Sequence, residues 1–232
     1  MRILDIIAKW LFILCLPVLL LTASIGWAAN SLWLYEYGFH KYNVGSTTGL
    51  SESQLKNVAI GLIRYLNSDE EYITLMVGKQ SEPFQLFNQR EIVHLKDVKG
   101  LIRLDYLVLL GTLIYILGYS GGSLYYRRPK YRRRLAWGVV AGSSLTLTLM
   151  LALGLGTLFD FDRLFWQFHL LSFSNELWQL DPTSDYMIML FPGGLWYDAF
   201  LLCALTTAVG AVILGGVAGG YLFSTGKRIA SK

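Results

Sequence analysis

Four long apolar stretches alternate with polar segments along the 232 residues of this chain. The apolar stretches cover residues 10–29, 106–126, 135–159 and 199–223. Each is about 20 residues or longer, the length that a helix rising about 1.5 Å per residue needs to cross about 30 Å of hydrocarbon. The pattern therefore predicts an all-α membrane protein with four transmembrane helices.

The polar segments differ in charge, and this difference assigns them to the two sides of the membrane. Residues 127–134, between the second and third stretches, read RRPKYRRR and contain no acid. The positive-inside rule makes this loop cytoplasmic, and an even number of crossings puts both termini on the same side. Residues 30–104 and 160–198 then form two outer loops, where we expect the chemistry of the protein.

The first apolar stretch also has features of a secretory signal peptide. A basic start precedes it, and the small residues Ala28 and Ala29 lie at its end. Its apolar core is long, however, and Trp27 is a poor residue near a cleavage site. The sequence therefore favours a retained first helix.

Composition fits a multi-pass membrane protein. The 54% hydrophobic content and 23 glycines suit helices that pack closely through small residues, as in residues 210–220. The net charge of +4 comes mostly from bases beside the spans, where they face anionic lipid, so nucleic-acid binding is not expected. Cys15 and Cys203 lie inside predicted spans and suit neither a disulfide nor a zinc site.

The outer loop 30–104 is long enough to fold as a small α+β domain outside the cytoplasm. Ser51 and Gln54 have capping-box spacing at the start of an amphipathic segment. Apolar residues then recur along one helical face. This pattern predicts a helix over residues 51–66 that lies on the membrane surface or on its neighbours.

The rest of this loop predicts two further elements. Residues 72–77 and 83–87 are typical of a short two-stranded hairpin, which needs another element to pack on. Asn88 and Glu91 have the spacing of a helix cap. We expect them to begin a helix that carries His94 and continues into the second span.

The second outer loop, residues 160–198, is rich in Phe and Trp. Such rings are typical of segments in the headgroup region, where one side is apolar and the other is wet. Asp160 or Asp162 is expected to cap the turn that carries His169, and Asp181 with the following proline is expected to stop the helix.

Two histidines are placed symmetrically about the outer face. His94 precedes the second span by about ten residues and His169 follows the third by about ten, so straight helices would lift both about 15 Å above the hydrocarbon edge. A bend would lower both to the headgroups. Spacing alone also fits isolated interface histidines, and Asp97, one turn after His94, is a candidate to orient its ring.

Other side chains are weaker candidates for chemistry. Asp105 and Asp198 end opposite spans but lie too shallow for an intramembrane aspartate dyad, and His40 belongs to no motif. The chain contains no GxSxG, Walker or HExxH motif, and its histidines lack metal-ligand spacing. We therefore expect neither a metal nor another cofactor.

Two segments resemble a known family. The sequence REIVHLKDVK before the second span, and FDRLFWQFHLLSFSNELWQLDPTSDYMIMLFP after the third, are similar to the lipoprotein intramolecular transacylase (Lit) family. The resemblance covers essentially the whole chain. It implies that His94 and His169 are catalytic and that the active site faces the outer leaflet of the cell membrane.

The resemblance also implies a reaction within one diacylglyceryl lipoprotein. The sn-2 acyl chain moves to the α-amino group of the lipoprotein's own N-terminal cysteine and leaves a lyso-form lipoprotein, with no external donor or cofactor. Because the substrate amine attacks the ester, the enzyme needs no nucleophile of its own. Phe165, Trp166 and Phe168 are candidates to hold acyl chains, or serve only as interface anchors.

One histidine is expected to act as general base and then acid, with a slight preference for His94, while the other orients it or donates to the oxyanion. Two other classes remain open. A non-enzymatic scaffold or subunit of a membrane complex would tolerate replacement of both histidines. A small transporter would need polar residues deep in its spans, where this chain has little beyond Ser and Thr. Nothing in the sequence indicates the oligomeric state.

Overall fold

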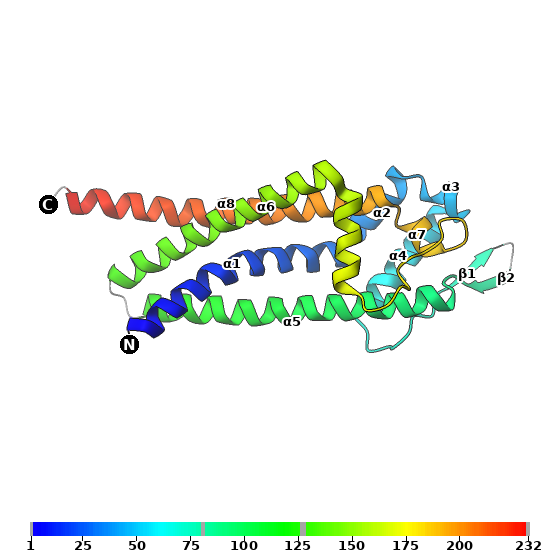
Figure 1. Cartoon of the computed structure of the whole chain (residues 1–232), viewed down its shortest axis with the longest axis horizontal. Helices are drawn as coiled ribbons and strands as arrows, with labels where there is room; N and C mark the ends of the chain where they lie inside the picture. Colours follow the sequence, from blue (N-terminus) through cyan, green and yellow to red (C-terminus); the bar gives the residue numbers. More distant parts are fainter. Residues whose placement is uncertain (1, 80–81, 126–128, 231–232) are drawn as a thin grey trace. The chain divides into compact units, whose positions relative to one another are not determined.

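The computed structural model describes residues 2–79, 82–125 and 129–230, and Figure 1 shows the arrangement of its elements. The elements are α1 (Arg2–Asn30), α2 (Leu32–Lys41), α3 (Val44–Thr48), α4 (Glu52–Leu66), β1 (Met76–Lys79), β2 (Glu82–Gln85), α5 (Gln89–Tyr125), α6 (Pro129–Ser172), α7 (Tyr186–Leu190) and α8 (Gly193–Ala230). Four of them, α1, α5, α6 and α8, are long and apolar enough to cross a membrane. The predicted count of four transmembrane helices is confirmed.

The chain forms two compact units. The first contains the segments up to Ile25, from 105 to 155, and from Leu202 onward. The second contains residues 26–104 and 156–201. Each long helix contributes to both units, because the helices continue past the apolar stretches into the polar segments.

Helices of the first unit approach one another closely where one side has a glycine. A Cβ atom on Gly142 of α6 would lie 2.8 Å from Leu16 Cδ2 of α1, so no larger residue fits without movement. A Cβ atom on Gly215 of α8 would lie 2.9 Å from the Cβ of Ser143. The predicted small-residue packing of residues 210–220 is therefore correct in part, since Gly216 faces open space.

The second unit is built around α4. The predicted capping box is confirmed, because Ser51 Oγ accepts from the Gln54 N–H at 3.4 Å while the Gln54 side chain accepts from the Ser51 N–H at 2.8 Å. The predicted apolar face of the helix is buried except for Ile63, which is half-buried. The buried members of that face are Leu55, Val58, Ala59, Leu62 and Leu66.

The predicted hairpin is present, but it is shorter and shifted. Strands β1 and β2 pair antiparallel, with Val77 opposite Phe84, whereas residues 72–75 lie outside the strand. The last ladder bond runs from Leu86 N to Leu75 O at 2.9 Å. Pairing ends there because Asn88, two residues later, already caps α5.

Helix α5 begins as predicted. Asn88 Oδ1 accepts from the Glu91 N–H at 3.0 Å, and Glu91 Oε2 accepts from the Asn88 N–H at 2.8 Å. This reciprocal cap starts a helix that runs without interruption to Tyr125. His94 therefore lies in the first part of a long helix whose later part is the second apolar stretch.

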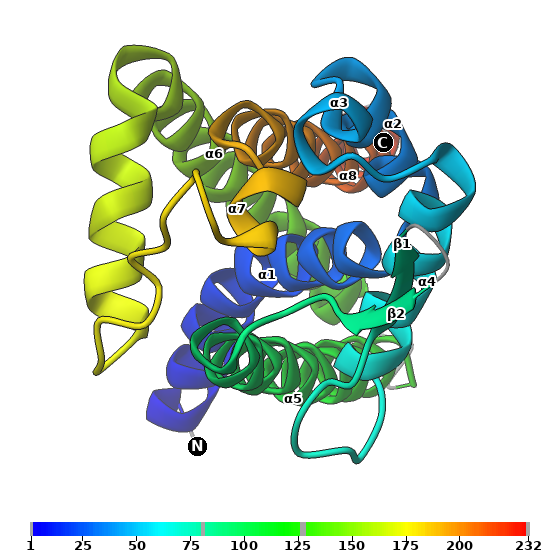
Figure 2. The ribbon, with the colours of Figure 1, turned by 90° about the vertical axis from the view of Figure 1, so that its right-hand side faces the viewer.

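Helix α6 bends at Asp160, where φ is −158° and ψ is 77°. Asp160 Oδ1 accepts from the Arg163 N–H at 3.1 Å, so Asp160 rather than Asp162 caps the segment that carries His169. That segment ends at Ser172, so the prediction that Asp181 stops the helix is wrong. The chain after Ser172, yellow in Figures 1 and 2, loops back to α7.

Candidate active site

His94 is held inside the second unit by packing. Its side chain is 3% exposed, and its Nδ1 atom is buried with no hydrogen-bond partner among the described residues. The ring of Phe173 lies against it, with centroids 4.9 Å apart. An imidazole nitrogen in this condition is available to a ligand that reaches it.

His169 is oriented by its own helix. Its Nδ1 lies 2.7 Å from the backbone oxygen of Phe165, one turn earlier. Because a carbonyl oxygen can only accept, Nδ1 carries the hydrogen, and Nε2 of the neutral ring keeps its lone pair. The side chain is 9% exposed.

The two histidines come together in the second unit. Their ring centroids are 6.3 Å apart and their planes differ by 27°. His94 reaches this position on the straight α5, and His169 reaches it on the part of α6 that follows the bend. The structure thus brings together the two residues that the sequence singled out, although spacing alone could not establish their contact.

Aromatic rings form most of the wall around the pair. Phe165, Trp178 and Phe173 lie 4.4, 4.9 and 5.5 Å from the centroid of His169. Both histidines lie outside the apolar stretches of α5 and α6, and burial lowers the pKa of each. The neighbouring His169 lowers the pKa of His94 further, while Asp97 partly opposes this. The site therefore favours two neutral imidazoles.

Asp97 does not orient His94 through a hydrogen bond in the described structure. Its Oδ2 accepts instead from Asn175 Nδ2 at 2.8 Å. Asn175 belongs to the chain that follows α6, so this bond fastens that chain to α5. The expected role of Asp97 as a direct partner of the ring is not supported, and its influence on His94 is electrostatic.

The sequence did not reveal the most deeply buried acid of the site. Glu91, one turn before His94, is 1% exposed, and its Oε1 accepts from the Met187 N–H of α7 at 2.6 Å. Nearby, Asn88 Nδ2 donates to Asp185 Oδ1 at 2.8 Å. Burial raises the pKa of Glu91. Its spacing predicted the helix cap, but nothing local indicated a partner about a hundred residues away.

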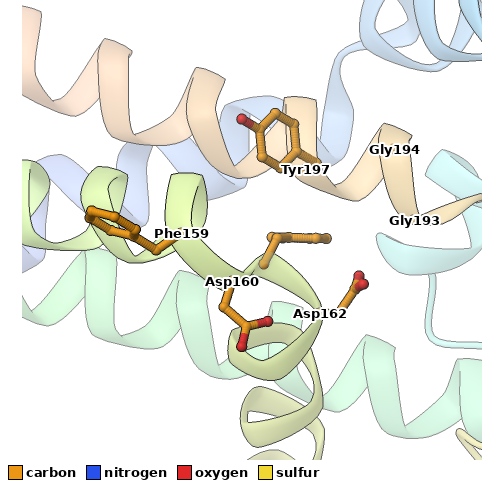
Figure 3. Close-up of a pocket in the computed structure, with 7 residues that line it drawn as sticks. Phe159, Asp160, Asp162, Gly193, Gly194 and Tyr197 are labelled. Carbon is orange, nitrogen blue, oxygen red and sulfur yellow. The ribbon is translucent and has the colours of Figure 1, made fainter.

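A shallow hollow of about 430 Å³ lies where α6 bends, beside the start of α8. Figure 3 shows the carboxylates of Asp160 and Asp162 on α6 and the ring of Tyr197 on α8. Phe161 also lines the hollow, and its ring stacks on that of Phe165 with centroids 5.4 Å apart. The ring of Phe165 in turn contacts that of His169. A continuous row of rings therefore connects the hollow with the histidine pair.

Other candidate residues have different roles. Asp198 accepts from Lys41 Nζ at 2.7 Å and from the Tyr42 hydroxyl at 2.8 Å, which joins α8 to α2. His40 is exposed on α2, and both cysteines are free. Among the described residues, no group of three or more His, Cys, Asp or Glu is placed to hold a metal ion.

Comparisons with known proteins show the family and the fold of the chain. The family model for the lipoprotein intramolecular transacylase Lit matches residues 10–196. The in meso structure of the membrane-integral Lit from Bacillus cereus superposes with a TM-score of 0.81 at 20% identity, covering 98% of this chain and all of that one. A structure of that protein with one histidine replaced by arginine matches with a TM-score of 0.76 at 20% identity, covering 98% of this chain and 95% of that one. A structure with the same histidine replaced by alanine matches with a TM-score of 0.76 at 19% identity, covering 97% of this chain and 96% of that one. No curated protein matches.

These findings decide between the classes that the sequence left open. The family model covers most of the chain, and the fold shared with the Bacillus cereus protein extends over nearly all of it. They show that the protein is an enzyme of the transacylase class rather than a scaffold or a transporter. The chain belongs to the lipoprotein intramolecular transacylase (Lit) family and is a multi-pass membrane enzyme of that family.

Proposed function

We propose that the enzyme moves the sn-2 acyl chain of a diacylglyceryl lipoprotein onto the α-amino group of the same lipoprotein's N-terminal cysteine. The amine nitrogen attacks the ester carbonyl, a C–N bond forms, and the C–O bond to glycerol breaks. The proton lost by the amine ends on the glycerol oxygen. The product is an N-acyl, S-monoacylglyceryl lipoprotein with the mass of the substrate.

The observation that carries this proposal is the contact of two buried histidines, whose burial favours the neutral imidazole. An α-amine has an ordinary pKa of about 7.7 to 8.0 and must lose a proton as it attacks, and a neutral imidazole with an ordinary pKa of about 6.5 is suited to take it. His94 and His169 provide two such rings 6.3 Å apart. Because amine and ester belong to one molecule, holding them together supplies much of the remaining acceleration.

The hydrogen bond of His169 favours it as the general base. Its Nδ1–H donates to the Phe165 backbone oxygen, so its Nε2 is the nitrogen that can accept a proton. His94 has a buried Nδ1 without a partner, which suits donation to the tetrahedral oxyanion. This assignment reverses the slight preference for His94 as base that the sequence suggested.

The row of rings from the hollow to the pair supports a path for an acyl chain. Phe161, Phe165 and Phe168 follow one another along α6 and end at His169. Trp166 lies outside this row and packs edge-on against Trp178, with the two ring centroids 4.7 Å apart. We assign Phe165 and Phe168 to acyl-chain binding and Trp166 to the membrane interface.

The charge pattern supports an orientation for these elements. The predicted loop 127–134 is helical from Pro129 onward, and residues 127 and 128 lie outside the described residues. With this basic segment in the cytoplasm, both termini are cytoplasmic and the histidines work at the outer leaflet. Segments 30–104 and 160–198 are then extracytoplasmic.

The test uses the purified enzyme and a synthetic diacylglyceryl-cysteine peptide in detergent, with products analysed by tandem mass spectrometry. Two substrates are mixed, one with heavy acyl chains and a heavy peptide and one fully light. Conversion to the N-acyl form at unchanged mass, with no heavy–light hybrids, is expected. Hybrids, free fatty acid or an unaltered substrate would overturn the proposal.

A further inference from the structure

Nδ1 of His94 is closed to substrate in this structure. It has almost no accessible surface, and the side chains of His94 and His169 are only 3% and 9% exposed. A reacting atom must come within about 3 Å of this nitrogen to bond with it, so part of the wall has to move before substrate engages His94. This inference rests on the function proposed above.

The wall that faces both rings is the chain after α6. The ring centroid of Phe173 lies 4.9 Å from that of His94 and 5.5 Å from that of His169. The ring centroid of Trp178 lies 4.9 Å from that of His169. We call residues 173–187 the strap. Its part between Ser172 and Tyr186 contains no helix or strand, whereas both histidines lie on long helices. The strap is therefore the part of the wall that can move at least cost.

The strap is fastened to α5 at its C-terminal end by buried bonds. The fully buried Glu91 accepts from the Met187 N–H at 2.6 Å. Asp185, which is 6% exposed, accepts from Asn88 Nδ2 at 2.8 Å and from the Asp181 N–H at 2.7 Å. Breaking this end would leave a buried carboxylate and buried N–H groups without partners, which is costly.

The N-terminal end of the strap is held more weakly. Asn175 Nδ2 donates to Asp97 Oδ2 at 2.8 Å in a half-buried pair. The exposed Arg90 donates from Nη2 to the Glu176 backbone oxygen at 3.0 Å. Water can replace both bonds when they open, so their net cost is small.

We propose that the strap is a substrate gate that pivots at its buried end, near Asp185, and opens where Asn175 is latched to Asp97. Opening at this end withdraws Phe173 and Trp178 from the histidines and admits the amine and ester. Closing returns the aromatic wall and excludes water during the transfer.

The experiment locks each end of the strap in turn. Cys15 and Cys203 are first replaced by serine. The latch variant then carries Asp97→Cys with Asn175→Cys, and the pivot variant carries Asn88→Cys with Asp185→Cys. A short bis-methanethiosulfonate reagent bridges each thiol pair and is removed with dithiothreitol, so every variant is compared with its own unbridged form.

Bridging the latch should lower the transacylase rate by at least about tenfold, with recovery after reduction, because opening precedes binding. Bridging the pivot should not lower the rate below that of its unbridged form, because the bridge replaces the removed bonds of Asn88 and Asp185 at an end that stays fastened when the strap opens. A bridged latch that keeps full activity would overturn the gate. Equal inhibition by both bridges would overturn the pivot. Inactivity of the unbridged wild type would instead count against the proposed reaction.

A second measurement does not depend on turnover. Diethyl pyrocarbonate modifies accessible neutral imidazoles, and the modified histidines are identified by mass spectrometry. The bridged latch should slow modification of His94 by about tenfold relative to the unbridged form, because local opening exposes the ring. His40, which is exposed on α2, serves as the internal control and should react equally in both forms. Equal modification of His94 in both forms would contradict the gate.

Discussion

Hydroxyl side chains of the first unit bond mainly within their own helices, whereas polar side chains of the second unit join distant segments. In the first unit, Thr22 Oγ1 donates to Val18 O and Thr146 Oγ1 donates to Gly142 O, both at 2.8 Å and both one turn back. A few hydroxyl groups of this unit instead bond between helices. Thr207 Oγ1 of α8, for example, donates to Ser24 Oγ of α1 at 2.9 Å. Such helices satisfy most of their polar groups locally, as hydrocarbon requires.

In the second unit the important bonds cross long stretches of sequence. The carboxylate of Glu91 accepts from the Met187 N–H, that of Asp97 from the Asn175 side-chain amide, and that of Asp198 from the Lys41 ammonium group. The first two bonds hold the strap against α5, beside the histidines, and the third joins α8 to α2. The comparison teaches that apolar length and small residues specify the first unit, while a few long-range polar pairs specify the unit that holds the histidine pair.

The largest effect is expected from the histidines themselves. His169→Gln removes the fixed proton acceptor and should lower kcat by about 10³-fold or more, within the range that general bases contribute. His94→Asn keeps an N–H near the position of Nδ1 and should lose only about 10- to 100-fold, as for a single oxyanion donor. The rates are measured by mass spectrometry with equal amounts of folded enzyme.

The exposed His40 provides the matched control, and His40→Asn should leave the rate unchanged. A greater loss in His94→Asn than in His169→Gln would reverse the assigned roles. Full activity in either variant would remove that histidine from the site.

The next effect tests the long-range pairs. Glu91→Ala leaves the N–H groups of Met187 and Asn88 without their acceptor, which should cost about 2–4 kcal/mol of folding free energy and reduce activity. Glu91→Gln keeps one acceptor oxygen and should fall between Glu91→Ala and wild type. Thermal unfolding of the purified protein gives the order of stability.

Glu176→Ala is the control for this series, because the side chain of Glu176 is exposed and only its backbone oxygen is bonded. It should unfold at the wild-type temperature. If Glu91→Ala were no less stable than Glu176→Ala, the second unit would not depend on its buried long-range pair.

The two units also differ in how well the sequence predicts them. Apolar length located all four long apolar helices, and local spacing located the caps at Ser51 and Asn88, because these features depend on neighbours within about a turn. For the third cap, the sequence left Asp160 and Asp162 as alternatives, and the structure has Asp160. The contact of Glu91 with Met187 has no local signature. The bond between Asp97 and Asn175 also has no local signature. The sequence therefore suggested Asp97 as a partner of the His94 ring, whereas in the structure its Oδ2 accepts from Asn175.

The histidine pair illustrates both cases. Counting residues from the span ends placed His94 and His169 at one level, but only the bend at Asp160 brings their rings to 6.3 Å. The direction of a bend depends on which aromatic surface the following segment packs against. A single sequence does not encode that in any periodic pattern.

A smaller effect tests the first unit. Gly142→Ala places a methyl group 2.8 Å from Leu16 Cδ2 and 3.3 Å from the Ile13 backbone oxygen, and should destabilise by about 1–3 kcal/mol. Gly111→Ala is the matched control, since a Cβ atom there meets nothing within 4 Å. The comparison is made by thermal unfolding in one detergent. Equal melting temperatures for the two variants would mean that helix proximity at Gly142 is not tight.

The smallest expected effect is the dependence of stability on pH. Burial lowers the pKa of His94 and His169 in the folded state, so on acidification the unfolded chain takes up protons first, near its ordinary pKa of about 6.5. The stability that these rings contribute is therefore complete above about pH 6.5 and is lost as the pH falls toward their folded-state pKa values. Between pH 7.5 and 5.5 the wild-type Tm should fall by a few degrees more than that of His94→Gln/His169→Gln, at about 2–4 °C per kcal/mol for a chain of this size. Equal slopes in the two proteins would mean that the rings are not held neutral in the folded enzyme, and would weaken both the case for their burial and the gate that depends on it.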